Sequence, residues 1–330
     1  MSGNYPPGSV FKVVTALAAL EEGVVDLSTT IQDEGILEVG DYQYTNWYYT
    51  QYGRVEGEFN LSRAIIRSND IFFYKTAEWL GPERLADYAR LLGLGQTTSI
   101  ELGSEAAGLV PDPAWKEERL GESWFLGNTY HYGIGQGDLL VTPLQIARVF
   151  QAIFNRGVIC RPTLLSEVRE CYDLGFNQNN LALIDQALLG VAQEGGTAFP
   201  LFDYNQSMAD VLSRRLGIET FNQMTAREKI RAGMVAGKTG TSEFGVVNER
   251  GYRATHAWFS SVVGLNKQLI LDHWQELGLA SASPAQQAWL EALKNDQLPQ
   301  EIVITVLVER DGETIYRRVR PMQHQSLEKF

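Results

Sequence analysis

A proline-rich turn followed by a uniformly apolar stretch is the feature that most constrains this chain. Residues 6–8 (Pro-Pro-Gly) cannot lie inside a helix, because proline lacks a backbone N–H and clashes with the preceding turn. Residues 10–21 are almost entirely apolar, and Gly23 follows them as a typical helix stop. A helix that is apolar on all sides is buried on all sides. The sequence therefore predicts a central helix in a large core, with Ser9 at its N-terminus.

Ser9 and Lys12 form the first candidate catalytic pair. The free N–H groups and the dipole at a helix N-terminus favour negative charge that develops near Ser9. Lys12 follows one turn later, so its amine can reach the Ser9 hydroxyl and serve as the base that makes it a nucleophile. A plain helix cap and a snorkelling lysine fit equally well, and the same spacing recurs at Ser326 and Lys329 in a polar tail. The pair alone is therefore not diagnostic.

The composition is that of a globular protein and excludes several classes of function. The chain has 330 residues, of which 44% are hydrophobic and 21% charged, enough for two domains or one large domain with a subdomain. A net charge of −12 without a basic stripe argues against a nucleic-acid partner. The longest strongly apolar runs, 13–20 and 302–308, are too short to cross a bilayer.

Neither the histidines nor the cysteines indicate a metal site. The four histidines show no metal-ligand spacing, so we expect no metal and no other cofactor. Cys160 and Cys171 can form one disulfide or none.

The expected elements are mainly helical first and rich in strands last. Residues 31–60 are expected to form short strands and loops with an aromatic cluster that packs a loop or lines a substrate cleft, and residues 100–115 a loop. Caps and breakers predict helices at 61–67, 71–80, 85–92, 181–194 and after the Thr142-Pro143 cap. β-branched and aromatic residues predict strands at 235–241, 255–263 and 302–309.

This order predicts an α+β fold: an antiparallel sheet packed between helices, with a mainly helical subdomain. The sheet is expected to receive the buried Ser9 helix on one face. We treat residues 1–330 as one domain, with insertions at about 203–231 and 265–300.

Two later segments are candidate partners of Ser9 and Lys12. Residues 68–70 (Ser-Asn-Asp) lie at a break between two helices, where a helix cap explains them equally well, and Ser-x-Asn recurs at residues 2–4. Residues 238–240 (Lys-Thr-Gly) lie on an expected strand. At average residue usage this tripeptide should occur by chance on the order of once in ten or more chains of this length. The order of the three segments carries more weight than any one of them.

In this order the segments resemble the signature set of penicillin-binding proteins and serine β-lactamases. The chain is similar to the transpeptidase domain of class B penicillin-binding proteins, most closely the elongation type. The resemblance covers residues 5 to about 259, together with 302–309. Further stretches that carry it are residues 5–8, 68–74, 133–137, 142–145, 195–198 and 256–259.

The resemblance implies a role for each residue of the three segments. It makes Ser9 the nucleophile and Lys12 the base, with Ser68 as the relay of a proton to the leaving amine and Asp70 as the group that holds Lys12. It implies that Lys238 raises the local positive potential, and that each lysine opposes the protonation of the other. It places the substrate carboxylate at Thr239, Gly240 and Thr241, and an oxyanion hole at the backbone N–H groups of Ser9 and Thr241.

The resemblance implies a peptidoglycan D,D-transpeptidase with a D,D-carboxypeptidase side activity. Its expected partners are peptidoglycan stem peptides, β-lactams, a wall glycosyltransferase and other wall-synthesis proteins. Its expected place is the extracytoplasmic face of the bacterial cell membrane. Family members carry an anchor, a pedestal and two strands before the nucleophile. Because Ser9 lies almost at the start of this chain, we expect these parts, and with them the membrane contact, to be missing.

There are two alternatives, a closely related enzyme and a protein of another class. A class A serine β-lactamase needs Glu-x-x-x-Asn between the second and third segments, but here this pattern occurs only at 56–60 and 291–295. The second alternative is a non-catalytic penicillin-binding sensor or scaffold, against which the complete set of catalytic residues argues.

The tail contains one more expected strand. Asp311-Gly312 is a tight-turn signal, and residues 314–319 follow it with strand-like alternation. We expect them to pair antiparallel with residues 302–308 and to cover an otherwise open edge.

Overall fold

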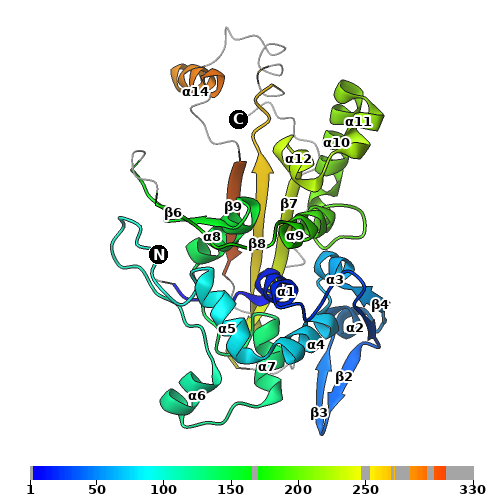
Figure 1. Ribbon diagram of the computed structural model, residues 1–330, viewed down its shortest axis with the longest axis vertical. Helices are drawn as coiled ribbons and strands as arrows, with labels where there is room; N and C mark the ends of the chain where they lie inside the picture. The colour runs from blue at the N-terminus through cyan, green and yellow to red at the C-terminus, as the bar shows by residue number, and fades with distance from the viewer. Residues whose placement is uncertain are drawn as a thin grey trace.

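Helix α1 (Lys12–Glu21) forms the centre of the molecule. The computed structural model describes residues 3–165, 170–246, 253–268, 271, 283–295 and 301–309. Every residue of α1 from Lys12 to Leu20 is buried, which confirms the predicted central helix. Figure 1 shows α1 surrounded by other helices, and it packs mainly on α4 (Asp70–Leu80), α5 (Pro82–Leu91) and α9 (Gln178–Val191).

Ser9 lies just before this helix, in a separate turn. The predicted single helix from residue 10 is divided into a 3-10 turn, η1 (Gly8–Val10), and α1. Gly8 has a φ of +55°, and a Cβ atom there would lie 2.4 Å from the carbonyl oxygen of Thr241, so only glycine fits. The Gly8 N–H also donates to the carbonyl of Gly135 at 2.8 Å. The glycine turn therefore holds Ser9 directly against a strand.

That strand belongs to a three-stranded antiparallel sheet in the order β7-β8-β9. The strands are β7 (Val235–Phe244), β8 (Ala254–Gly264) and β9 (Glu301–Val308), so all three predicted strands are confirmed with shifted ends. In the register of the sheet, Lys238 lies opposite Ser260, and Ser260 lies opposite Thr305.

The helical layer over this sheet differs from the prediction. Helices α8 (Pro143–Phe154) and α9 pack against the strands, and η1 rather than α1 makes the extensive contact with β7 (Figure 1). The reason lies in α8, which buries an apolar face that includes Ile146, Val149 and Ile153. Since α1 is apolar all round, it lies deeper, among helices.

The opposite face of β9 is apolar and open. Side chains alternate along this strand, and Ile302, Ile304, Val306 and Val308 are 37% to 51% exposed. Among the described residues, β9 pairs on one side only, with β8. The strand predicted at residues 314–319 lies outside the described residues, so its pairing with β9 stays a prediction.

The first third of the chain forms helices with two small two-stranded antiparallel sheets. The predicted helix α3 (Leu61–Arg67) is confirmed, and so are α4 and α5. The predicted short strands are β1 (Thr30–Asp33) paired with β4 (Gly57–Asn60), and β2 (Ile36–Val39) paired with β3 (Tyr42–Thr45). Three helices were not expected from the sequence: α2 (Trp47–Tyr52), α6 (Pro113–Leu120) and α7 (Leu126–Gly133). α6 begins inside the predicted loop of residues 100–115.

Both expected insertions contain helices. Residues 203–231 hold α10 (Phe202–Leu216), α11 (Ile218–Gln223) and α12 (Ala226–Arg231), preceded by the 3-10 turn η2 (Phe199–Leu201). The described part of 265–300 includes α14 (Pro284–Lys294). Their standing as insertions within one domain stays a prediction.

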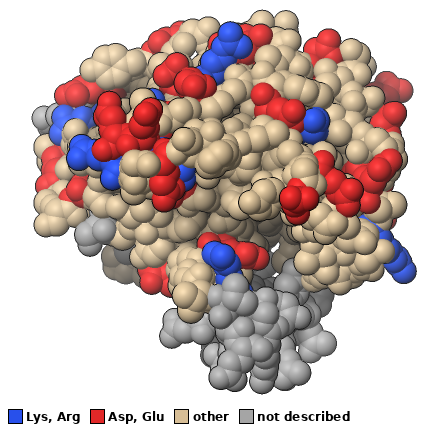
Figure 2. Space-filling model, turned by 90° about the horizontal axis from the view of Figure 1, so that it is seen from below, with Lys and Arg blue, Asp and Glu red and all other residues tan. Residues whose placement is uncertain are grey.

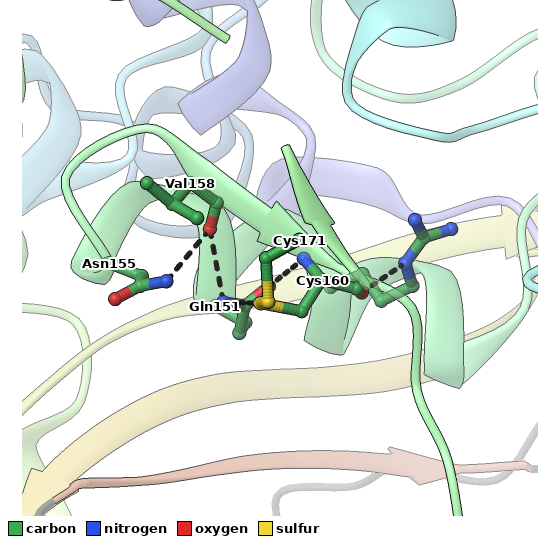
Figure 3. The surroundings of a disulfide bond; sticks show 6 residues. Gln151, Asn155, Val158, Cys160 and Cys171 are labelled. Atoms are coloured by element: carbon green, nitrogen blue, oxygen red, sulfur yellow. Dashed lines mark hydrogen bonds between the residues drawn. A yellow bond between two sulfur atoms is a disulfide. The ribbon is translucent and has the colours of Figure 1, made fainter. Parts of the chain in front are cut away.

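The two cysteines form a disulfide, an outcome that the sequence left open. Cys160 and Cys171 are directly opposite on β5 (Val158–Cys160) and β6 (Cys171–Asp173). Figure 3 shows Gln151 beside this bond: its side chain donates to the Val158 carbonyl at 3.1 Å and accepts from the Cys160 N–H at 3.1 Å.

The surface agrees with the acidic composition. Acidic side chains are scattered over the face seen in Figure 2, with smaller groups of basic side chains among them. Within the part of the chain that the structure describes, no helix is both long and apolar enough to cross a bilayer.

Candidate active site

Lys12 links the first candidate segment to the second. Its side chain is fully buried, and its amine donates to the Ser68 carbonyl at 2.7 Å and to Asp70 Oδ1 at 2.6 Å. The Ser68 hydroxyl lies 3.4 Å from the same amine. The expected contact with Ser9 is not formed: within the described residues, the Lys12 amine bonds to these three oxygens and to no atom of Ser9. A charged carboxylate attracts the ammonium more strongly than a neutral hydroxyl does.

Residues 68–70 serve as helix caps and as partners of Lys12 at once. Ser68 ends α3 with a φ of +57°, a left-handed conformation that is uncommon for serine. Asn69 caps α4 by accepting from the Phe72 N–H at 2.8 Å. The capping interpretation from the sequence is therefore correct, and the functional one is compatible with it. The strained backbone at Ser68 is the kind of outlier that clusters at active sites.

A buried polar network that sequence reasoning missed holds this segment. Asp33, 1% exposed, accepts from the side-chain amides of Asn46 and Asn69, at 2.7 Å each. Asn46 in turn accepts from the Asp70 N–H at 3.1 Å, and the Trp47 N–H donates to Asp70 Oδ2 at 2.8 Å. Asp70 is thus fixed on both carboxylate oxygens. The only signal for Asn46 in the sequence is its place as a cap before an aromatic run, and Asp33 carries none.

The aromatic residues at 42–52 fall into two groups, one that packs a loop and one that lies beside the candidate site. Tyr44 packs edge-on against Tyr74 and Tyr130, as expected for a packed loop. Trp47 and Tyr48 instead lie against the guanidinium of Arg67, next to Ser68. These two rings are therefore the part of the cluster that lies beside the candidate site.

The third segment lies on β7, the strand that η1 contacts. Lys238 is fully buried, and its amine donates to the Thr239 carbonyl at 3.0 Å. Gly240 is also buried, and a Cβ atom there would lie 3.0 Å from both the Pro7 carbonyl oxygen and the Val10 N. Thr241 is exposed, and its carbonyl accepts from the Gln136 side chain at 3.4 Å. The close fit of Gly240 and Gly8 brings the first and third segments together.

Both lysines are easier to deprotonate than an exposed lysine. Burial lowers the pKa of Lys12 below its ordinary value, and the charge of Asp70 opposes that shift. Burial lowers the pKa of Lys238 much further, and the charge of Lys12 adds to the effect. The predicted repulsion between the lysines therefore acts on Lys238, whereas burial is the cause at Lys12. A desolvated amine of this kind can accept a proton from a hydroxyl.

Two further observations bear on substrate and cofactor. Thr239 shares a 2.7 Å hydrogen bond with Thr197, a residue that sequence reasoning placed only in a family-like stretch. Across the described ranges, no cluster of three or more His, Cys, Asp or Glu side chains is arranged to hold a metal ion.

Comparisons with known proteins point to one family. Residues 1–272 match the family model described as the penicillin binding protein transpeptidase domain. The peptidoglycan D,D-transpeptidase MrdA of Escherichia coli (strain K12) is 34% identical over 170 residues, which are 51% of this chain and 26% of that protein. MrdA of Haemophilus influenzae is 29% identical over 317 residues, 90% of this chain and 46% of that protein.

Solved structures point the same way. The penicillin-binding protein PBP2 of Helicobacter pylori, in its complex with MreC, superposes with a TM-score of 0.65 and 26% identity, over 93% of this chain and 46% of that one. Pseudomonas aeruginosa PBP2, in complex with WCK 5153, gives a TM-score of 0.63 and 26% identity, over 94% and 57%.

The chain thus spans roughly a quarter to a half of the length of the relatives named MrdA. The match of the family model extends over most of this chain and includes all three segments. The chain belongs to the penicillin-binding protein transpeptidase family.

Proposed function

We propose that this chain is the transpeptidase domain of an elongation-type peptidoglycan D,D-transpeptidase. The observation that carries the proposal is the meeting of three segments far apart in the sequence. Lys12 bonds to Ser68 and Asp70, while the turn around Ser9 packs on the Lys-Thr-Gly strand. A hydroxyl, a desolvated amine and a relay hydroxyl in one place are the parts that acyl transfer requires.

In the proposed first step Ser9 Oγ attacks the carbonyl carbon of the penultimate D-Ala of a stem peptide. Lys12 accepts the hydroxyl proton, and Asp70 orients the amine through its 2.6 Å contact. The oxyanion that forms is stabilised by the backbone N–H groups of Ser9 and Thr241. The C–N bond then breaks, and Ser68 relays a proton to the departing D-Ala amine.

In the proposed second step an amine of another stem peptide attacks the Ser9 ester. The ester C–O bond breaks, a new amide forms, and Ser9 regains its proton, which leaves a crosslink between two peptides. Water as the acceptor gives the D,D-carboxypeptidase side reaction. The negative terminal carboxylate of the donor peptide, bound by Thr239, Gly240 and Thr241, favours the protonated form of Lys238, which then supplies positive potential.

Place and partners are proposed on the same basis. The Cys160–Cys171 disulfide supports the extracytoplasmic face of the membrane, because disulfides persist in oxidising compartments. The Helicobacter pylori relative was solved in a complex with MreC, which supports a wall-synthesis protein of that kind as a partner. Stem peptides, β-lactams and a wall glycosyltransferase complete the proposed set.

The test is an acyl-transfer assay on the intact chain. The protein is incubated with a stem peptide ending in D-Ala-D-Ala and with a second stem peptide as acceptor, and D-Ala release and crosslinked product are followed. We expect both products with the wild type and neither with Ser9→Ala. Rapid turnover of a chromogenic β-lactam without crosslinking would instead support a β-lactamase, and β-lactam binding without either reaction would support a sensor.

A further inference from the structure

The loop after α9 touches the candidate substrate site, yet the proposed roles do not use it. Thr197, in the stretch Gly195-Gly196-Thr197, shares a 2.7 Å hydroxyl–hydroxyl hydrogen bond with Thr239 of the Lys-Thr-Gly segment. Thr197 and Thr239 are both partly buried. The bond therefore joins the loop to the residue that is proposed to hold the substrate carboxylate.

The loop is held in place by its own backbone. Gly195 has a φ of +81°, and a Cβ atom on Gly196 would lie 2.2 Å from the Val191 carbonyl oxygen, so the chain folds back closely on the end of α9. The Ala198 N–H donates to the same carbonyl at 2.9 Å. Thr197 is thus presented to β7 from a fixed position.

Arg67 connects the loop that carries Thr197 to the residues around Ser68. Its guanidinium donates to the Gly195 carbonyl at 2.6 Å and pairs with Glu56 at 2.7 Å. The guanidinium also lies over the ring of Tyr48, 5.3 Å from its centre. Arg67 directly precedes Ser68, so one side chain connects the end of α3 with the loop that carries Thr197.

The direction of the hydroxyl bond matters for substrate binding. A threonine hydroxyl has one proton to donate and two lone pairs that accept. A carboxylate only accepts, so Thr239 can bind it well only when its proton points to the substrate. Thr239 can donate its proton to the carboxylate if its oxygen accepts the hydrogen bond from the Thr197 hydroxyl. In a series of hydrogen bonds of this kind, each bond polarises the next. Loss of an ordinary hydrogen bond of this kind weakens binding roughly fivefold.

We propose that Thr197 and Arg67 are positioning residues for the carboxylate end of the substrate. Thr197 donates to Thr239 so that Thr239 donates to the carboxylate, and Arg67 holds the Thr197 loop at the distance this bond requires. The inference rests on the proposed function, because it uses Thr239 as a carboxylate ligand.

The experiment measures acylation by benzylpenicillin and by its methyl ester, which lacks the carboxylate charge. Stopped-flow kinetics separate the dissociation constant of the first complex from the acylation rate constant. Thr197→Val should weaken the first complex with benzylpenicillin roughly fivefold, with the rate constant nearly unchanged. Thr197→Val should leave binding of the methyl ester unchanged. Thr197→Ser keeps the hydroxyl and should therefore give the wild-type values.

Arg67 is tested against a matched arginine on the same helix. Like Arg67, Arg63 lies over an aromatic ring, but its side chain donates to the backbone carbonyls of Glu56 and Glu58, so its contacts are with residues 56–59. Arg67→Met should weaken benzylpenicillin binding as Thr197→Val does, whereas Arg63→Met should leave it unchanged. The double variant Arg67→Met/Thr197→Val should be no weaker than the more affected single variant, because both act through one bond.

Several results would overturn the inference. Equal losses with benzylpenicillin and its methyl ester would mean that Thr197 supports the fold and not the carboxylate contact. Equal effects at Arg67 and Arg63, or fully additive effects of Arg67 and Thr197, would remove the link between them. A wild-type protein that forms no adduct on Ser9 would instead refute the proposed function.

Discussion

Lys12 and Lys238 are both fully buried amines, but their contacts differ, and so do the roles proposed for them. Arginine keeps a cation at either position and cannot give up its proton. Lys12→Arg removes the proposed base, so we expect the acylation rate constant to fall by a factor on the order of 10³ or more. Lys238→Arg keeps the positive charge beside Thr239 and should reduce acylation far less. Stopped-flow acylation measures both, with thermal unfolding as a control for folding. Equal losses would contradict the assigned roles.

The pH dependence of acylation also follows from Lys12. Burial lowers its pKa from the usual 10.5, so the neutral amine forms at lower pH than in an exposed lysine. Acylation should therefore rise with pH and level off below pH 10.5. Because the folded protein gives up this proton more readily than the unfolded chain, stability should also rise with pH between the lowered pKa and 10.5.

The charge of Asp70 opposes the lowering of the Lys12 pKa, so a variant at Asp70 tests whether Lys12 controls the pH dependence. Asp70→Asn removes the negative charge beside Lys12, so the midpoint of the pH–rate profile should move to lower pH. A midpoint that stays in place or moves upward would show that another group controls the profile.

The Cys160–Cys171 disulfide joins strands β5 and β6, an arm of the molecule made of these two strands. It joins residues 11 positions apart, and a loop of this length corresponds to about 3 kcal/mol of stabilisation by the chain-entropy relation. The arm is peripheral to α1 and the three-stranded sheet, so the effect should be local. In Cys160→Ser/Cys171→Ser, amide hydrogen exchange in β5 and β6 should speed up markedly, while acylation stays at the wild-type rate. Unchanged exchange would mean that the hairpin does not depend on the bond.

Helices α9 and α12 meet at a buried pair that should make stability depend on pH. Arg227 lies 3.6 Å from Asp185, and burial raises the pKa of Asp185 to about 7 while the arginine charge opposes the shift. Glu301 raises the same pKa, and Arg156 and Arg231 lower it. The folded protein therefore holds this proton at pH values where the unfolded chain has released it, and stability falls as the pH rises toward 7.

Asp185→Asn removes this titration. Relative to the variant, the wild type should lose up to about 1.4 kcal/mol of unfolding free energy per pH unit between roughly pH 5 and 7. Urea unfolding at several pH values measures the difference, and a difference that does not change with pH would contradict the role of Asp185.

For the whole molecule, local patterns predicted most of the fold around the site. The apolar run after Pro-Pro-Gly predicted α1, and β-branched runs predicted β7, β8 and β9. Helices α6 and α7 were not expected, because α6 begins within a segment that contains Gly103, Gly108, Pro111 and Pro113, and α7 has the mixed sequence Leu-Gly-Asn-Thr-Tyr-His-Tyr-Gly. Tertiary packing decides such segments, and one-dimensional periodicity does not report it.

Part of the candidate site was predicted from the sequence and part was missed. The order of the three segments, and the family resemblance that it carries, predicted that Ser9, Lys12, residues 68–70 and residues 238–241 lie together. Asp33 and Arg67 were missed because their roles come from contacts across the fold, such as Arg67 reaching Gly195 from 128 positions away. No local pattern in the sequence encodes a contact of that range.

Covalent labelling by penicillin tests the central claim most directly. A β-lactam presents a strained amide and a carboxylate to the groups that are proposed to bind D-Ala-D-Ala, so the intact protein should gain one adduct. Peptide mass spectrometry should place it on the peptide that contains Ser9, and the adduct should be long-lived and absent from Ser9→Ala. An adduct on Ser326, or one that persists unchanged in Ser9→Ala, would contradict the account.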